Sequence, residues 1–177
     1  TSNSATLTVN AAPAVTTHPA HTAVCAGADA TFCVTATGTG LTYQWQVSTA
    51  GSTGPWADRP GSTSSCFTAT AVSATANGNA YQCIVSGTCT PAVTTACATL
   101  TVNTAAAITA QPVNTSGCTG GNATFSVTAT GSGLTYNWQV STDGGVTWNN
   151  VSPAVTTASI SLTAVTAGMN NNQYRCQ

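Results

Sequence analysis

Polar and apolar residues alternate along most of the chain, and apolar residues do not recur at the spacing of three to four that marks a helix. Phe32-x-Val34-x-Ala36 and Leu41-x-Tyr43-x-Trp45 are clear examples. The alternation predicts strands, separated by glycine-rich or polar turns, at residues 13–24, 29–37, 41–48, 55–59, 65–72, 79–87 and 96–103. This succession of short strands and turns is typical of an antiparallel β-sandwich, so the predicted fold class is all-β.

The pattern repeats after 93 residues, because Leu7-Thr8-Val9-Asn10 recurs as Leu100-Thr101-Val102-Asn103 and the aromatic positions recur at the same interval. We therefore expect a terminal strand at 1–10, which belongs to a preceding unit or to a neighbouring subunit. A first sandwich at 11–103 and a second at 104–177, which lacks its final strand, would follow. The predicted core aromatic residues are Phe32, Trp45 and Tyr81, with their counterparts Phe125, Trp138 and Tyr174.

Charged residues make up only 3% of the 177 residues, and none of them is lysine. Nucleic-acid binding is excluded, because its affinity depends on the number of phosphates that cations neutralise. The same scarcity of cations excludes binding to an anionic membrane surface. No apolar run approaches the roughly 18 residues that cross a membrane, so membrane insertion is not expected. Eight cysteines in such a chain indicate an oxidising compartment and hence a secreted or cell-surface protein.

Several segments resemble the strands of an immunoglobulin-like domain. Residues 32–38 and 41–45 resemble its B and C strands, and residues 77–83 (NGNAYQC) resemble its E–F corner and F strand. Together with residues 85–102, they make the whole chain similar to the bacterial immunoglobulin-like repeats of long secreted and cell-surface proteins. The resemblance implies tandem immunoglobulin-like antiparallel β-sandwiches in an extracellular, bacterial context, and it implies no particular ligand.

The cysteines depart from the usual immunoglobulin pattern, since Val34 and Val127 stand where the B strand normally has an inward cysteine. Cys33 and Cys66 are both serine in the second unit, and in the implied fold they lie outward on neighbouring strands, which makes them predicted partners. The cysteines of the first unit allow many other connectivities, and free thiols remain an alternative. The favoured bridges are Cys25–Cys83, Cys118–Cys176, Cys33–Cys66 and Cys89–Cys97.

Catalysis is not expected from so few ionisable residues. Paired carboxylates must lie within roughly 10 Å for hydrolysis, and Asp29, Asp58 and Asp143 fall in separate parts of the predicted sandwiches. His18 and His21 are interpreted as exposed strand residues, because no third metal ligand accompanies them. We predict no catalytic residue, no metal site and no cofactor.

Residues 141–148 (STDGGVTW) resemble the Asp-box hairpin of sialidase-like propellers. The first unit lacks the aspartate at the same place, so the segment is interpreted as a turn. Trp56 and Trp148 follow the two turns, and packing at the sheet rim is favoured over carbohydrate stacking. The Asn-x-Ser/Thr pattern gives three candidate glycosylation sites, Asn114, Asn122 and Asn150.

The favoured function is a non-catalytic structural module of an extracellular filament or cell-surface array. Its partners would be copies of itself or adjacent immunoglobulin-like repeats, joined head to tail, with residues 1–10 donated to the next subunit as a strand. One alternative is an adhesin that binds glycans or surface proteins through loops such as 87–95. Another is an accessory domain of a secreted hydrolase.

Overall fold

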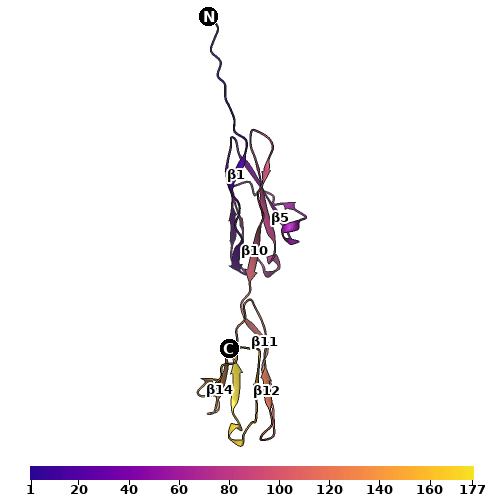
Figure 1. Cartoon of the computed structure of the whole chain (residues 1–177), viewed down its shortest axis with the longest axis vertical. Coiled ribbons are helices and arrows are strands. Elements are labelled where there is room, and N and C mark those ends of the chain that lie inside the picture. The colour runs from indigo at the N-terminus through magenta and orange to yellow at the C-terminus, as the bar shows by residue number, and fades with distance from the viewer. The chain divides into compact units, whose positions relative to one another are not determined.

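The computed structural model describes residues 1–177 and divides into two compact units, unit 1 (Thr1–Thr104) and unit 2 (Ala105–Gln177) (Figure 1). Both units consist of strands, which confirms the predicted all-β class. The helices are single turns of 3-10 helix, namely η1 (Gly51–Thr53) and η2 (Ala74–Ala76) in unit 1 and η3 (Ala167–Met169) in unit 2.

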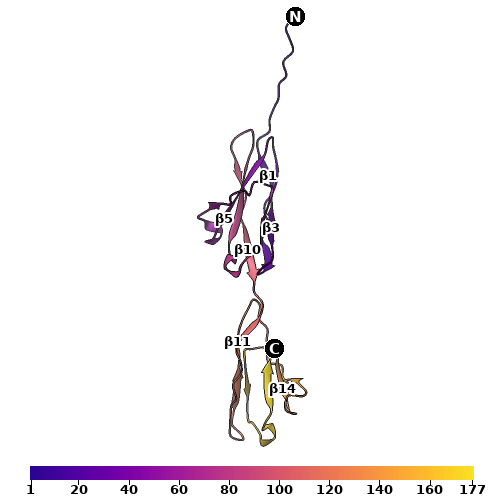
Figure 2. The same ribbon diagram turned by 180° about the vertical axis from the view of Figure 1, so that it is seen from behind.

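Unit 1 combines one large sheet with two strand pairs (Figure 2). The large sheet has the order β2-β10-β8-β5-β6, with β9 also paired to β8, while β1 pairs with β4 and β3 pairs with β7. The strands are β1 (Ala14–Thr17), β2 (Thr22–Cys25), β3 (Ala30–Cys33), β4 (Thr35–Thr37), β5 (Thr42–Ser48), β6 (Ala57–Asp58), β7 (Cys66–Ala69), β8 (Ala80–Ser86), β9 (Val93–Thr94) and β10 (Ala98–Asn103).

The predicted first strand, at 13–24, is interrupted at the buried Pro19. Proline has no backbone N–H and therefore cannot continue a hydrogen-bonded ladder. The residues before it form β1, which pairs antiparallel with β4, and those after it form β2, which pairs with β10. The chain thus changes its partner sheet within one predicted strand.

The core of unit 1 consists of aromatic and aliphatic side chains. Trp45 is 0% exposed, and its indole N–H donates to the carbonyl of Ser64 at 2.9 Å. Phe32 and Tyr81, also buried, stack with ring centroids 4.6 Å apart. The alternation in the sequence therefore places the expected side chains of this unit between its sheets.

Strand β10 closes one side of this core by pairing with two strands of opposite direction. It runs parallel to β2, with Leu100 opposite Thr22 and Asn103 opposite Cys25, and antiparallel to β8. The parallel pair departs from the expectation of a purely antiparallel sandwich. Leu100 and Val102 on β10 are 1% and 4% exposed, so both side chains belong to the core.

Unit 2 repeats most of this arrangement in residues 105–177, which correspond to residues 12–84 of unit 1. Its sheets are β15-β14-β17, β12-β16 and β11-β13. No strand in unit 2 is equivalent to β2, β9 or β10. The strands are β11 (Ala107–Ala110), β12 (Ala123–Ser126), β13 (Thr128–Thr130), β14 (Trp138–Ser141), β15 (Asn149–Asn150), β16 (Ser159–Leu162) and β17 (Gln173–Cys176).

The core of unit 2 is smaller than that of unit 1. Trp138 is 0% exposed and donates its indole N–H to the carbonyl of Thr157 at 3.0 Å, as Trp45 does to Ser64. Phe125 and Tyr174, which were predicted as core residues, stack at 4.9 Å but are only partly buried. The reason is the missing counterpart of β10, which covers the equivalent side of unit 1.

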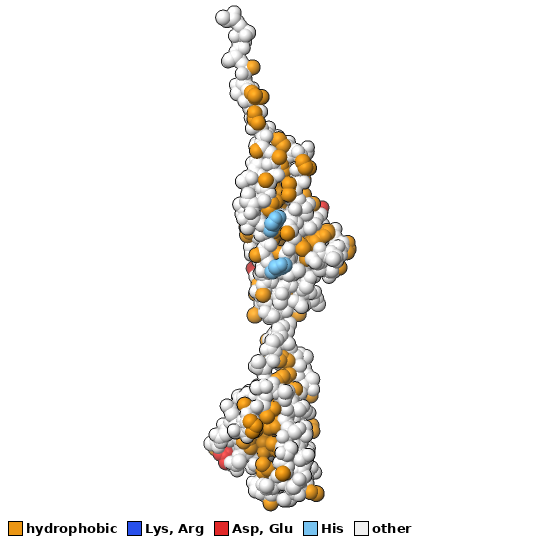
Figure 3. Space-filling view, viewed as in Figure 1, with side chains coloured by type: hydrophobic (Ala, Val, Ile, Leu, Met, Phe, Trp, Pro, Cys, Tyr) orange, Lys and Arg blue, Asp and Glu red, His pale blue; other side chains and the backbone are white.

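Residues 1–10 form no strand, and every one of them is exposed. Leu7 and Val9 are 86% and 82% exposed, and apolar side chains are visible along this segment (Figure 3). The segment therefore presents a strand-like sequence to solvent without a partner.

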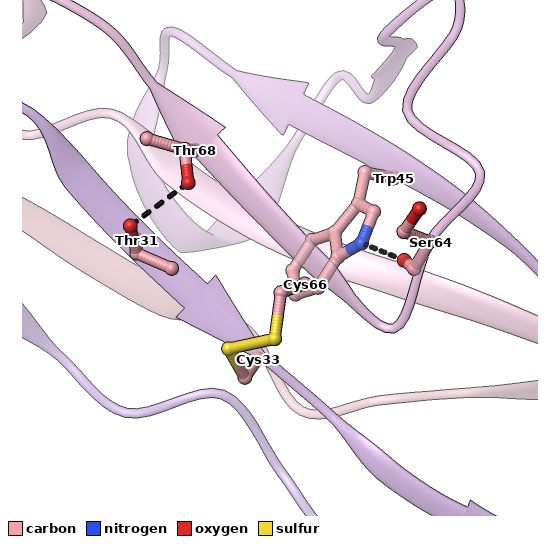
Figure 4. Close-up of a disulfide and its surroundings, with 6 residues drawn as sticks. All are labelled: Thr31, Cys33, Trp45, Ser64, Cys66 and Thr68. Atoms are coloured by element: carbon pink, nitrogen blue, oxygen red, sulfur yellow. Dashed lines mark hydrogen bonds between the residues drawn. A yellow bond between two sulfur atoms is a disulfide. The ribbon is translucent and has the colours of Figure 1, made fainter.

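One disulfide is present, and it joins Cys33 on β3 to Cys66 on β7 (Figure 4). The two residues are direct register partners on the exposed face of the strand pair, where Thr31 and Thr68 also share a hydrogen bond of 2.8 Å. The predicted Cys33–Cys66 bridge is confirmed.

The other three predicted bridges are absent, and their six thiols are free. Cys25 lies opposite Asn103, the last residue of β10. The backbone of Cys83, in contrast, is hydrogen-bonded to Thr95, which precedes the first residue of β10. Thr95 and Asn103 are eight residues apart, so at about 3.3 Å per residue the two cysteines are roughly 26 Å apart along the strand direction, which corrects the expected Cys25–Cys83 pairing.

The predicted Cys118–Cys176 and Cys89–Cys97 bridges are also absent. Cys176 lies on β17 opposite the core residue Trp138, and Cys118, the counterpart of Cys25, is exposed and outside every strand. Cys89 was expected to bond to Cys97, but its sulfur lies 3.5 Å from the carbonyl oxygen of Asn10.

Candidate functional site

An open groove lies along unit 2 on the side where β10 lies in unit 1. Its volume is about 680 Å³. The partly buried Phe125 and Tyr174 line it together with Leu162 and Val165, so the groove reaches the incomplete core. One wall consists of residues 114–117 and Thr119, and another contains three consecutive asparagines, Asn170, Asn171 and Asn172.

In unit 1, hydrogen bonds to the backbone of β10 hold this strand at the equivalent place. The N–H of Leu100 donates to the carbonyl of Asn79 at 2.8 Å, and the N–H of Gly78 donates to the carbonyl of Leu100 at 2.9 Å. The N–H of Val102 donates to the side-chain oxygen of Asn77 at 2.8 Å. At the end of the strand, the N–H of Ala26 donates to the carbonyl of Asn103 at 2.8 Å. These bonds fix both the position and the register of β10.

The equivalent atoms of unit 2 are in place but have no hydrogen-bond partner. They are the carbonyl of Asn172, the N–H of Asn171, the side-chain oxygen of Asn170 and the N–H of Thr119. Asn171 has a positive φ of 66°, like Gly78 at 86°, so the turn that presents these atoms keeps its shape. Asparagine tolerates this backbone conformation better than most residues do. Unit 2 therefore offers the contacts that receive β10 in unit 1.

Strand β17 is consequently an edge strand. It pairs with β14 alone, whereas its counterpart β8 has β5 on one side and β10 on the other. An unpaired strand edge next to exposed apolar side chains is a template for the addition of another strand.

Residues 5–10 have the sequence ATLTVN, which is identical to the whole of β10. In β10 the leucine and valine of this sequence are buried, and in residues 5–10 they are exposed. Burying these two side chains in the groove of a unit would stabilise that unit by about 3–6 kcal/mol. The entropic cost of ordering the segment has to be subtracted from this value. The chain thus carries both a groove for this strand and an exposed second copy of it.

The two histidines hold the segment that contains strand β10. The Nδ1 atom of His18 accepts from the N–H of Ala96 at 3.0 Å, and that of His21 accepts from the N–H of Thr99 at 2.9 Å. Both histidines are at the surface of unit 1 (Figure 3). At the equivalent positions unit 2 has Gln111 and Asn114, whose side-chain oxygens can accept from a backbone N–H in the same way.

The STDGGVTW segment forms a hairpin turn held by Asp143. Its carboxylate accepts from the hydroxyl of Thr147 at 2.6 Å, from that residue's N–H at 2.9 Å, from the N–H of Val146 at 3.1 Å and from the hydroxyl of Ser141 at 2.7 Å. The bonds from Thr147, followed by that from Ser141, hold the pKa of Asp143 well below its usual range. The carboxylate therefore serves to close the turn, as expected from the sequence.

Trp148, after this turn, packs at the rim of the sheet. The guanidinium carbon of Arg175 lies 4.2 Å from the centre of its ring, and its indole N–H donates to the carbonyl of Gly145 at 3.0 Å. Arg175 also donates to the side chain of Gln139. One face of the Trp148 ring is thus covered by a cation, which favours the packing interpretation over a sugar-stacking surface.

The remaining aspartates likewise hold local structure. Asp29 accepts from the N–H of Ala71 at 2.7 Å, and Asp58 accepts from the side chain of Gln46 at 2.7 Å. The structure does not bring these carboxylates together, nor does it gather three or more side chains able to hold a metal ion.

The three candidate glycosylation sites, Asn114, Asn122 and Asn150, are exposed in unit 2 and stay predictions. Asn114 lines the groove. Asn122 accepts from the N–H of Ala164 at 3.4 Å, and Asn150 accepts from the side chains of Asn137 and Gln139. No helix in the structure has the length and apolar character needed to span a membrane.

Sequence reasoning missed the residues that form the groove. The sequence contained one signal, because Asn77-Gly78-Asn79 recurs as Asn170-Asn171-Asn172. The role of these residues as hydrogen-bonding partners of a strand emerges only from the register of β10.

Comparison with known proteins identifies the fold. No family model matches the sequence, and no curated protein sequence is significantly similar to it. Among solved structures, immunoglobulin domains 1–5 of Sidekick-1 match with a TM-score of 0.55 and 20% identity over 74% of this chain and 28% of that one. The first two immunoglobulin domains of DIP-gamma match with a TM-score of 0.57 and 13% identity, over 86% of this chain and 83% of that one.

A three-domain immunoglobulin fragment of titin matches with a TM-score of 0.62 and 16% identity, over 94% of this chain and 60% of that one. The chain therefore spans less than a third of the Sidekick-1 structure and well over half of the other two. At these identities the likeness shows the fold, and the predicted tandem immunoglobulin-like sandwiches are confirmed. The matches give no support to a bacterial origin.

Proposed function

We propose that the protein is a non-catalytic structural module of an extracellular filament or cell-surface array, whose copies join head to tail. Residues 1–10 of one copy occupy the groove of unit 2 in the next copy and complete its sheet. The observation that supports this most directly is the identity of residues 5–10 with β10, together with a groove that has the hydrogen-bonding atoms of a β10 site.

The register of the added strand follows from unit 1. Leu7 takes the place of Leu100 between Asn171 and Asn172, and Val9 takes the place of Val102 beside Asn170. The leucine and valine side chains then cover Phe125 and Tyr174. Since the groove and the donated strand are different surfaces, the contact is heterologous and continues from copy to copy as an open chain.

An extracellular location agrees with the disulfide in unit 1, because disulfides persist in oxidising compartments. It also agrees with the low charge, since a protein buried in an array needs few charged groups to remain dispersed. The likeness to structures that contain several immunoglobulin domains agrees with an assembly of similar modules.

Sedimentation velocity over a range of protein concentrations tests the proposal. The chain is expected to form a series of oligomers that lengthens with concentration. Leu7→Asp is expected to keep it monomeric, because a charge would enter the apolar groove, and unit 1 should stay folded because Leu7 makes no core contact there.

Thr8→Asp is the matched control. Its counterpart Thr101 is exposed on β10, so the added charge stays in solvent and assembly should persist. Strand donation is abandoned if the unaltered chain stays monomeric at high concentration, or if both variants weaken assembly equally.

A further inference from the structure

A free thiol of unit 1 lies at the point where residues 1–10 leave the folded domain. The sulfur of Cys89, in the loop between β8 and β9, is 3.5 Å from the carbonyl oxygen of Asn10. Cys89 is partly exposed and not disulfide-bonded. Asn10 is therefore in contact with a cysteine of its own copy.

A second free thiol would meet Asn10 from the neighbouring copy. In unit 1, Asn103 is the direct partner of Cys25 in the parallel ladder, and Ala26 donates to the carbonyl of Asn103. The 93-residue repeat relates Asn103 to Asn10, and Cys25 to Cys118. When residues 1–10 occupy the groove in the register of β10, Asn10 becomes the ladder partner of Cys118. Neighbouring strands lie about 5 Å apart, so Cys118 reaches the same residue that Cys89 contacts.

We propose that Cys118 of one copy and Cys89 of the next form an interchain disulfide that locks the donated strand in the groove. The inference rests on the proposed strand donation. Both cysteines would then lie beside Asn10, and the bond requires the loop that carries Cys89 to place the two Cα atoms roughly 4.4–6.8 Å apart.

The other thiols are less suited to this bond. Cys33 and Cys66 are already bonded to each other. Burial raises the pKa of the Cys83 and Cys176 thiols, which reduces the fraction present as the reactive thiolate. The thiol of Cys118, in contrast, is exposed.

The bond forms by exchange with a low-molecular-weight disulfide of the oxidising compartment. The Cys118 thiolate attacks this disulfide, which gives a mixed disulfide and releases one small thiolate. The Cys89 thiolate then attacks the sulfur of Cys118 and releases the second small thiolate. The two protons from the cysteines pass to the two released thiolates, so the small disulfide is reduced to two thiols.

The test compares full-length variants after incubation with oxidised glutathione. On denaturing gels without reductant, the unaltered chain is expected to give a ladder of covalent oligomers that disappears on reduction. Cys89→Ser and Cys118→Ser should each abolish the ladder. Cys25→Ser, which removes another exposed thiol, should retain it.

A mixture of the Cys89→Ser and Cys118→Ser variants sharpens the test. Each provides the thiol that the other lacks, so the mixture should form covalent dimers and stop there. Mass spectrometry of the digested dimer should identify a Cys89–Cys118 linkage. A ladder that persists in Cys89→Ser, a mixture without dimers, or a different linkage would overturn the inference.

Sedimentation under reducing conditions separates this inference from the function on which it rests. Oligomers that form in reductant and depend on Leu7, but that never become covalent, would refute the disulfide and leave strand donation standing. If oligomers do not form in reductant either, both proposals fail.

Discussion

Unit 1 and unit 2 share a repeated sequence, but only unit 1 has a closed core. Phe32 and Tyr81 of unit 1 are 1% and 3% exposed, whereas their counterparts Phe125 and Tyr174 are only partly buried. The two tryptophans are equally buried, so the centre of the sandwich forms in both units. The difference shows that the final strand closes one side of a core that the other strands have already built.

The units also differ in their local cross-links, without consequence for the fold. Unit 1 has the Cys33–Cys66 disulfide where unit 2 has Ser126 opposite Ser159. Unit 2 has the Asp143 hairpin where unit 1 has alanine at the matching position. Local cross-links are therefore interchangeable between the units, while the strand that completes the sheet is not.

The largest expected effect comes from completing unit 2 within its own chain. Gln177 corresponds to Ile84, so a copy of residues 85–103 joined after Gln177 supplies the missing strands. Unit 2 should gain about 3–6 kcal/mol in its free energy of unfolding, from the leucine and valine side chains that enter the groove. Urea unfolding measures the gain.

The extended chain should also cease to assemble, because the groove is filled. The control is the same extension in which aspartate replaces both the leucine and the valine that would enter the groove. This control should not raise the free energy of unfolding of unit 2. A gain of equal size from both extensions would contradict the role assigned to the groove.

The next prediction compares Leu100, which is buried in β10, with its exposed counterpart Leu7. Leu100→Ala should lower the free energy of unfolding of unit 1 by about 2–5 kcal/mol, because it removes a buried side chain and leaves a cavity. Leu7→Ala should leave unit 1 unchanged and weaken only the assembly. Urea unfolding of dilute, monomeric protein checks both, and equal destabilisation of unit 1 by the two variants would refute the comparison.

A somewhat smaller effect comes from transferring the disulfide to unit 2. Ser126 and Ser159 are register partners, as Cys33 and Cys66 are in unit 1. The double variant Ser126→Cys/Ser159→Cys should form a disulfide and stabilise unit 2 by about 2–4 kcal/mol, mainly by restricting the unfolded chain. Thermal unfolding with and without reductant measures the difference. A double variant that forms the bond without gain in stability would show that unit 2 is strained at this place.

The smallest effect concerns the hairpin of unit 2. The lowered pKa of Asp143 means that its bonds stabilise the folded turn above the ordinary carboxyl pKa and are lost only as the pH falls through the lower, folded-state value. Amide exchange at Val146 and Thr147 should therefore stay slow through mildly acidic pH and accelerate only in strongly acidic solution.

Asp143→Asn is the matched variant, and it should remove this pH dependence. The corresponding turn of unit 1, which lacks the aspartate, should show no such dependence in either protein. Fast exchange already at mildly acidic pH would contradict the lowered pKa.

Much of the fold could be predicted from the sequence, because alternation determines which residues share a strand face. It placed Trp45 and Trp138 in the core and Cys33 on an outward face, and the paired serines of unit 2 identified Cys66 as its partner. The alternation does not determine which strand lies beside which. Cys25 was misassigned because the chain breaks at Pro19 and β2 then pairs in parallel with β10, away from Cys83.

Only part of the candidate site could be predicted from the sequence. The repeat identified residues 5–10 as a second copy of the sequence that forms β10. The groove that could receive it depends on tertiary contacts, since Asn170 becomes a hydrogen-bond acceptor for a strand only through the turn beside it. Periodicity contains no information on such contacts.

The parallel ladder between β2 and β10 has a mechanical consequence. The chain enters unit 1 before β2 and leaves it after β10, so tension on the two ends pulls these strands in opposite directions along their length. All bonds of the ladder are then sheared together instead of being peeled apart one at a time. The proposed junction has the same geometry, because residues 7–10 would lie parallel to residues 115–118, so a pull along the filament would load the joints in the same shearing direction as the modules.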